Sequence, residues 1–240
     1  VSREATSVSC LCITTRCRKS RRRRRRHRRR CAVWPTAATP ASSGRHGVAA
    51  AAEDGVPAQT RQDVLGELTA VEGELRQASK AYGDDFQAVL PLNSWHERVL
   101  RTQAWLWRSR GLEPLTLWQS NLWDPLPLIG TPGTEAELAV DVHLMRKEHR
   151  AAAFNVSNSS DEPMQVAFRL SGLPGGDNPD YVTVHEVAWT DTYFGVPVAA
   201  ALPEVGPEND LYTVSVPAGM TRQVWLTFHP VDWAGWSREA

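Results

Sequence analysis

The stretch MQVAFRL at residues 164–170 decides the fold class of this chain. Apolar side chains stand at every second position from Met164 to Leu170, and the polar residues Gln165 and Arg169 stand between them. Successive side chains of a β-strand point to opposite faces of the sheet. The alternation therefore predicts a strand with one buried and one exposed face.

The same two-residue period recurs along most of the chain after Leu115. The apolar positions of the further predicted strands are Leu138, Val140, Val142 and Leu144; Ala152, Phe154 and Val156; Val182, Val184, Val187 and Trp189; Val196, Val198 and Ala200; Tyr212, Val214 and Val216; and Val224, Leu226 and Phe228. In the group that starts at Val182 the period slips at His185 and Glu186, which predicts a β-bulge.

Turn-forming sequences separate the predicted strands. They are NVSNSSDEP at residues 155–163, GLPGGDNP at residues 172–179 and PAG at residues 217–219, all rich in residues that turns prefer. Seven or eight short strands joined by turns, with no helix between them, predict antiparallel sheets packed face to face. We therefore expect a mainly β fold, in which residues 113–230 form an immunoglobulin-like β-sandwich.

An α-helical hairpin is predicted ahead of the strands, in residues 53–112. Thr60 and Ser94 each open a capping box, the first helix is expected to stop at Gly83, and the second near Gly111. The residues expected on the packed faces are Leu65, Leu68, Val71, Leu75 and Ala78 in the first helix, and Val99, Leu100, Gln103, Ala104 and Trp107 in the second. Both helices are amphipathic, so we expect them to pack on each other and on the sandwich.

The net charge of zero conceals a basic N-terminal arm on an acidic body. Residues 16–30 hold eleven Arg and one Lys, whereas from Ala32 onward 14 basic residues face 26 acidic ones, a net charge of −12. An Arg run repels itself, and the Pro-, Ala- and Ser-rich stretch after it cannot bury a core, so residues 1–52 are predicted to be disordered. A mistranslated start, which yields such runs from a GC-rich gene, is favoured over a solvated linker and over a nucleic-acid-binding arm.

Cysteine usage and hydropathy exclude several kinds of site. The cysteines are Cys10, Cys12, Cys17 and Cys31, all in the arm, so the body has no thiolate metal site and no thiol nucleophile. Their spacing does not match a zinc motif. No window of about 18 apolar residues predicts a membrane span, and no apolar stretch after the Arg run is long enough for a signal peptide. We expect no membrane, no metal and no cofactor.

No catalytic residue set emerges from the sequence. A glycosidase needs two carboxylates about 5–10 Å apart in one cleft, and nothing brings together the candidates Asp124, Glu186 and Asp191. The histidines of the strand region lack metal-ligand spacing, and neither a G-x-S-x-G motif nor a glycine-rich phosphate loop is present. Sequons for N-glycosylation begin at Asn155 and Asn158. We therefore expect no enzymatic activity from this chain alone.

Tryptophan is the strongest candidate for a contact surface. The chain has ten, and nine of them lie at or after residue 95. Trp118 and Trp123 flank QSNL just before Asp124, and alternation places Trp225 on the outward side of its strand. An outward indole marks contact with another domain or with a sugar ring. Trp118, Trp123, Asp124 and Trp225 are thus the candidate binding residues, with domain packing favoured because the helical hairpin needs an apolar floor.

Three stretches carry a resemblance to a known type of domain: LTLWQSNLWDPLPL at residues 115–128, LSGLPGGDNPDYVTVHEVAWTDTYFGVPVAAALPE at residues 170–204 and YTVSVPAGMTRQVWLTFHP at residues 212–230. They resemble the accessory β-sandwich that precedes the catalytic barrel in large bacterial glycoside-hydrolase-like proteins. The resemblance covers roughly half of the chain and implies an extracytoplasmic or secreted location. The barrel would hold the acid/base carboxylates, so no catalytic residue is carried over. The tail, residues 231–240, does not read as a strand that enters a barrel.

The expected function is that of a non-catalytic accessory domain of a truncated glycoside-hydrolase-like protein, which packs against a catalytic domain and shapes its cleft. Its partner would be that catalytic domain, which this chain lacks. One alternative is a carbohydrate-binding module that stacks polysaccharide on Trp118, Trp123 or Trp225. A second is a nucleic-acid binder that uses the Arg-rich arm, which is less expected because the acidic body repels nucleic acid.

Overall fold

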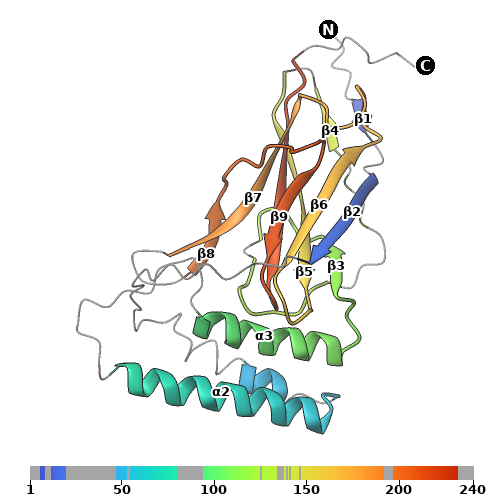
Figure 1. Ribbon diagram of the computed structural model, residues 1–240. Helices are drawn as coiled ribbons and strands as arrows, with labels where there is room; N and C mark the ends of the chain where they lie inside the picture. Colours follow the sequence, from blue (N-terminus) through green and yellow to red (C-terminus); the bar gives the residue numbers. More distant parts are fainter. Residues whose placement is uncertain are drawn as a thin grey trace.

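The computed structural model describes residues 6–8, 12–19, 47–52, 55–79, 94–124, 126–133, 138, 140, 142–145, 147–191 and 197–231. Long strands stand on end above two helices, α2 and α3, which lie across the lower end of the sheets in Figure 1. The fold is mixed: helices are combined with mostly antiparallel sheets. This differs from the expected mainly β class, because the predicted hairpin contributes a complete helical layer.

The largest sheet has five strands in the spatial order β3-β5-β10-β7-β8. Their bounds are Leu115–Trp118 for β3, Arg150–Asn158 for β5, Thr221–Phe228 for β10, Val182–Asp191 for β7 and Pro197–Ala201 for β8. A second sheet has the order β2-β6-β9, and a third pairs β1 with β4; these strands are Cys12–Lys19, Met164–Ser171, Tyr212–Val216, Thr6–Val8 and Val142–Leu144. All these pairings are antiparallel, as the turn-rich sequence predicts.

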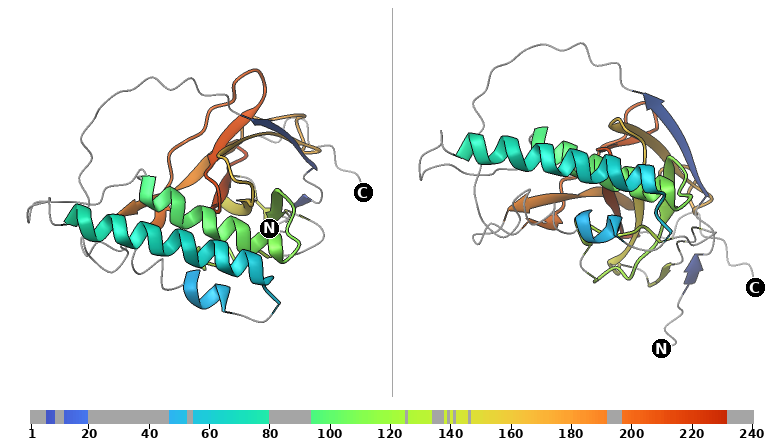
Figure 2. Two further views of the ribbon diagram at one scale, coloured as in Figure 1. Left: turned by 60° about the horizontal axis from the view of Figure 1, so that its bottom comes forward. Right: turned by 90° about the horizontal axis from the view of Figure 1, so that it is seen from below.

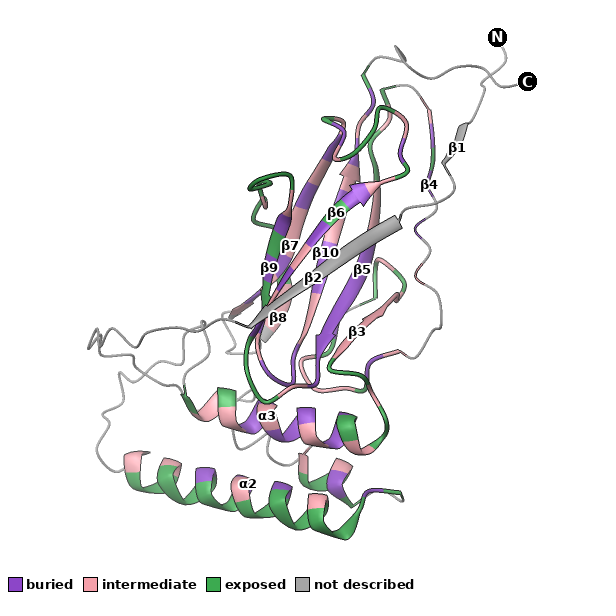
Figure 3. Cartoon of the chain, turned by 45° about the vertical axis from the view of Figure 1, so that its right-hand side comes forward, coloured by how far each residue is buried: buried purple, intermediate pink, exposed green. Residues whose placement is uncertain are grey.

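One hydrophobic core is shared by strands of the five-stranded and three-stranded sheets. Phe168 of β6 meets Phe154 of β5 edge to face and stacks on Tyr212 of β9, with ring centroids 5.6 Å apart in both pairs. Further core members with almost no exposure are Val156, Val166, Leu170, Val184, Val214, Val216, Val224 and Leu226. Buried and exposed residues alternate along β9, and β5 is buried along most of its length (Figure 3). The predicted inward positions of these strands are confirmed.

Strand β7 differs in detail from its prediction. It pairs with β10 without a shift from Val182 to Val187, so the bulge expected at His185 and Glu186 is misplaced; the irregularity lies between Ala188 and Trp189, against β8. The slip in apolar period has another cause. Residues at the start of β7 face the shared core, whereas Trp189 belongs to a second apolar cluster beside α3.

The strand order also differs from the immunoglobulin arrangement. In that arrangement the last strand lies in the same sheet as the third and the sixth. Here β10, the last described strand, lies between β5 and β7, while β6 and β9 pair in the other sheet. The connections β5–β6, β6–β7, β8–β9 and β9–β10 therefore each run from one sheet to the other. Alternation predicts which residues face a core, but it does not determine which strands become neighbours.

Helices α2 (Ala58–Ser79) and α3 (Ser94–Ser109) confirm the predicted hairpin helices and run side by side (Figure 2). The predicted end of α3 at Gly111 is also confirmed. The Gly111 N–H donates to the Arg108 carbonyl at 2.9 Å, and the Leu112 N–H donates to the Trp107 carbonyl at 3.1 Å. This is the Schellman motif, and the φ of 85° at Gly111 is the left-handed conformation that the motif requires. The stop expected for the first helix at Gly83 lies outside the described residues.

Two details of α2 were predicted wrongly. The helix begins at Ala58, and the Pro57 carbonyl accepts the Arg61 N–H at 2.9 Å, so Thr60 lies within the first turn and is not the cap. Leu65, expected on the packed face, is 37% exposed, whereas Val64 is fully buried against α3. With apolar residues at both neighbouring positions, the sequence does not determine which of them the partner helix covers.

The two helices are also held together by an ion pair network. Arg98 of α3 donates to Glu67 at 2.5 Å and to Glu74 at 2.7 Å, both on α2. These bonds raise the pKa of Arg98 and, with a bond from the Trp95 indole, lower the pKa of Glu74. Around the network, Val64, Leu68, Val71, Val99 and Leu106 form an apolar cluster of the hairpin.

The other face of α3 packs on the lower end of the five-stranded sheet. Leu100, Leu126, Trp189 and Met220 form the apolar part of this junction, with Trp118, Leu128, Ile129 and Ala199 at its margin. Buried Gln103 joins three segments: its amide donates to the Gly219 carbonyl at 2.6 Å, and its side-chain oxygen accepts the Gly130 N–H at 3.0 Å. The helical hairpin thus packs its second apolar face on the end of the sheet, as its amphipathic helices predict.

Hydrogen bonds from α3 to the Asp161 carboxylate, here called the Asp161 clamp, also stabilise this junction. Asp161, in the β5–β6 turn, accepts hydrogen bonds of 2.8 Å from Arg108 and from the Trp105 indole, and the bond from Arg108 is the main cause of its lowered pKa. A lowered carboxyl pKa stabilises the fold above the ordinary value of 3.8, and this contribution is lost as the pH falls below it. Because Asp161 is half exposed, we expect Asp161→Asn to cost roughly 0.5–1 kcal/mol at neutral pH.

Urea unfolding of the wild type and Asp161→Asn as a function of pH checks this expectation. The difference in unfolding free energy should be constant near neutral pH and should close below the ordinary carboxyl pKa. A difference that does not change with pH would mean that the carboxylate charge plays no part in the clamp.

The N-terminal arm contributes strands, contrary to the expected disorder of residues 1–52. Strand β2 pairs with β6 along its whole length, β1 pairs with β4, and residues 47–51 form a helical turn. The segment Cys12–Lys19 precedes the densest Arg run and contains three consecutive β-branched residues, Ile13, Thr14 and Thr15, which favour a strand. It also covers an edge of β6 that would otherwise leave backbone groups unpaired. The Arg run at residues 21–30 and the tail at residues 232–240 lie outside the described residues.

Candidate functional site

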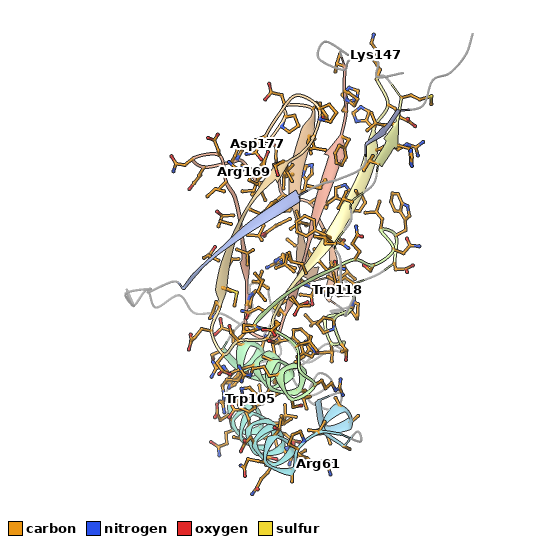
Figure 4. All side chains as sticks on the ribbon, turned by 90° about the vertical axis from the view of Figure 1, so that its right-hand side faces the viewer. Arg61, Trp105, Trp118, Lys147, Arg169 and Asp177 are labelled. Atoms are coloured by element: carbon orange, nitrogen blue, oxygen red, sulfur yellow. The ribbon has the colours of Figure 1, made fainter. Side chains whose placement is uncertain are left out.

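The four candidate residues do not form one cluster. Trp118, at the end of β3, is partly buried, and its indole N–H donates to Ser157 Oγ at 2.9 Å. Its ring lies so close to Gly133 that a Cβ at that position would stand 2.8 Å from it. Figure 4 shows Trp118 at the lower end of the sheets, next to α3. Trp118 is therefore a packing residue of the junction.

Trp123 has the opposite character. It is 78% exposed, the highest value among the large apolar side chains that the structure describes. Its ring meets Trp225 edge to face, with centroids 5.7 Å apart and planes at 75°. Trp225 lies on β10 opposite Ala153 and His185, on the outer face of the five-stranded sheet, as predicted. Edge-to-face contact with a partner on a rigid strand limits the motion of Trp123 and leaves much of its surface open.

A tight turn presents Trp123 to the solvent. The Trp123 N–H donates to Asn121 Oδ1 at 3.0 Å, and the Asp124 N–H donates to the Asn121 carbonyl at 3.1 Å. An Asn side chain that bonds the backbone two residues ahead is the Asx-turn. Asp124, also exposed, is the next residue after the indole. Three of the predicted residues, Trp123, Asp124 and Trp225, are thus gathered on one surface, and Asn121 is a residue that the sequence analysis missed.

Beneath this turn lies a set of buried polar side chains on the outer face of the same sheet. Asn155 is fully buried, and its side-chain amide donates to Ser120 Oγ at 3.0 Å. Gln223, 5% exposed, donates to Asn155 Oδ1 at 3.1 Å. Ser157, 1% exposed, bonds Thr221 Oγ1 at 2.7 Å. Asn155 and Asn158 each have no exposed surface, so neither predicted sequon presents an accessible amide in this fold.

The candidate carboxylates do not share a cleft. His185 is paired with Trp225 on the outer face, so the next residue, Glu186, points to the other face of β7. Glu186 acts there on Arg222, where its charge partly opposes the lowering of the Arg222 pKa by burial. Asp124 lies on the outer face with Trp123, and the side chain of Asp191 is outside the described residues. The sheet therefore separates Asp124 from Glu186, so these two cannot act as a pair across one sugar bond.

Two histidines meet at the far end of the sheets, which their spacing did not predict. The rings of His149 and His229 stack with centroids 3.6 Å apart and planes at 6°, and His229 Nδ1 lies 3.4 Å from the Glu148 carbonyl. Within the described ranges, no group of three or more His, Cys, Asp or Glu residues could hold a metal ion. Two parallel rings alone do not make such a site.

Comparisons with family models, with curated proteins and with solved structures found no match to the chain. In the part of the chain that the structure describes, none of the helices combines the length and apolar character that a membrane span needs. The surface formed by Trp123, Asp124 and Trp225, here called the Trp123 surface, is therefore the main structural indication of function.

Proposed function

We propose that the two larger sheets form a β-sandwich, and that this sandwich is a non-catalytic accessory domain which binds carbohydrate through Trp123. The sandwich is supported by the shared core in which Phe154, Phe168 and Tyr212 meet, and by four connections that cross between the sheets. The accessory role is supported by the resemblance of residues 115–230 to the sandwich of glycoside-hydrolase-like proteins. The observation that carries the ligand class is the 78% exposure of an indole fixed against Trp225.

Sugar stacking is favoured over domain packing because the hairpin already packs on the end of the five-stranded sheet without using Trp123. Trp118 and Trp189 belong to the junction with α3, so the reason for expecting a packing role does not extend to Trp123 and Trp225. The other exposed large apolar side chains of the described chain are Val48, Leu65, Leu202 and Val231, which belong to separate segments. A domain interface usually buries a contiguous patch of several residues. A single exposed indole, followed directly in the chain by exposed Asp124, suits one sugar ring with its C–H face on the indole.

A pull-down with insoluble polysaccharides tests this proposal. The wild type, Trp123→Ala and Leu65→Ala are incubated with cellulose, chitin, xylan and mannan, and the bound fraction is measured. We expect retention of the wild type on at least one of these, and a loss of about tenfold in affinity for Trp123→Ala, or about 1.4 kcal/mol. Leu65→Ala removes an exposed apolar side chain of helix α2, away from Trp123 and Trp225, and should bind like the wild type.

The second candidate is packing of the same surface against a catalytic domain, in line with the resemblance. It is favoured by the edge-to-face indole pair, since tryptophan is also enriched at protein interfaces. Equal retention of the wild type and Trp123→Ala would contradict binding through Trp123. Retention of neither on any polysaccharide would contradict carbohydrate binding and leave this candidate. Hydrolysis of a glycoside by the purified chain would contradict both.

A further inference from the structure

We propose that Ser120, Asn155 and Gln223 are positioning residues, which fix the Trp123 turn to the sheet so that the indole is held ready for its ligand. The proposal extends the function proposed above and depends on it for the identity of the ligand. The positioning itself does not depend on which ligand binds: a buried chain of hydrogen bonds fixes the place of the exposed Trp123 side chain.

The chain of hydrogen bonds connects the five-stranded sheet to the turn in three steps. Gln223 of β10 donates to Asn155 of β5 at 3.1 Å, and Asn155 donates to Ser120 at 3.0 Å. Ser120 directly precedes Asn121, whose side chain and carbonyl close the turn on Trp123 and Asp124. The polar chain thus ends where the turn begins.

An aromatic contact fixes the other end of the same segment. Gln223 and Trp225 are two residues apart on β10, so both side chains lie on the outer face of the sheet. Ser120 is attached through Asn155 to the first of them, and Trp123 rests against the second. Attachment at both ends restricts the segment 120–123 to one placement on the sheet.

The free-energy cost of burying the amides of Asn155 and Gln223 indicates that these side chains have a specific role. Asn155 is fully buried and Gln223 nearly so, and amides in such places are unfavourable unless their bonds are made. An apolar pair would fill the same space without this requirement, but it would let the turn settle in several placements. A satisfied polar chain permits one placement, which is what a preformed binding surface needs.

Ser120→Ala tests the proposal with a small change at a half-buried position, which the fold should tolerate. It removes the acceptor of the Asn155 amide and leaves a buried donor without its partner. Such a loss shifts an equilibrium about fivefold or more, here toward turns detached from Trp225. Two indoles in contact give an exciton signal in far-ultraviolet circular dichroism, and we expect this signal to fall in Ser120→Ala and to be absent in Trp123→Ala.

Two controls separate positioning from general stability. Ser120→Thr keeps the hydroxyl and should restore the exciton signal and the binding of polysaccharide. Ser159→Ala removes a buried Ser hydroxyl outside the Trp123 turn, which donates to the Glu113 carbonyl at 2.8 Å, and should leave both unchanged. An unaltered exciton signal in Ser120→Ala would overturn the proposal. Loss of the signal in a protein whose wild type binds no polysaccharide would uphold positioning and refute carbohydrate binding.

Discussion

Phe168→Ala is expected to lower the free energy of unfolding by about 3–5 kcal/mol, the range for removal of a large side chain from a packed core. Phe168 is fully buried and contacts Phe154 of the five-stranded sheet as well as Tyr212 of its own sheet. Its loss leaves a cavity between the two sheets, which neither sheet can close without moving toward the other. Equilibrium unfolding in urea measures the effect.

The neighbouring residue provides the control for this substitution. Arg169 lies on the exposed face of the same strand and pairs with Asp177 at 3.3 Å, and Figure 4 labels both on the outside of the sheets. Arg169→Ala should cost no more than about 1 kcal/mol, as for other surface ion pairs. Equal losses from Phe168→Ala and Arg169→Ala would show that the sheets do not share a core at this position.

Gly219→Ala is expected to destabilise the protein by about 2–4 kcal/mol, since it combines backbone strain with steric overlap. Gly219 has a φ of 68°, in the left-handed region. A Cβ here would overlap the Leu100 carbonyl oxygen and would stand 3.0 Å from the Ala104 nitrogen. The β9–β10 turn would have to move away from α3 and break the 2.6 Å bond from Gln103. Thermal and urea unfolding both report this loss.

Gly73→Ala is the matched comparison. Gly73 lies within α2, where a Cβ would meet no atom within 4 Å. Alanine at such a helical position stabilises by about 0.5–1 kcal/mol. Opposite signs for the two glycine substitutions are thus expected. A neutral Gly219→Ala would mean that the hairpin does not pack tightly on the sheet end.

Local patterns predicted much of the fold. The inward positions of β6, β9 and β10, both helices and the end of α3 at Gly111 follow from a period or a turn residue within the segment itself. The order of the strands does not follow, because it depends on which edges meet after folding. The same applies to strand β2, which pairs with β6 across more than a hundred residues of sequence.

The candidate site was predicted in part. Four residues, Trp118, Trp123, Asp124 and Trp225, were expected to be binding residues, and the last three of them lie on one surface. Trp118 was grouped with them because it is near in sequence, but the chain that follows β3 folds back and covers it through Gly133. The Asn155–Gln223 pair was missed because a polar residue at an outward position normally indicates solvent. Only the register of β5 and β10 brings the two amides together.

The proposed function requires that Trp123, and not the junction tryptophans, contacts the ligand. A nitrogen-15 NMR titration of the indole N–H signals with soluble oligosaccharides of the retained polysaccharide tests it most directly. We predict that the Trp123 signal shifts most, with a smaller shift of Trp225. The signals of Trp107 and Trp118, whose N–H groups are hydrogen bonded inside the junction, should stay in place. A stationary Trp123 signal, or a larger shift of Trp107 or Trp118, would contradict ligand binding through Trp123.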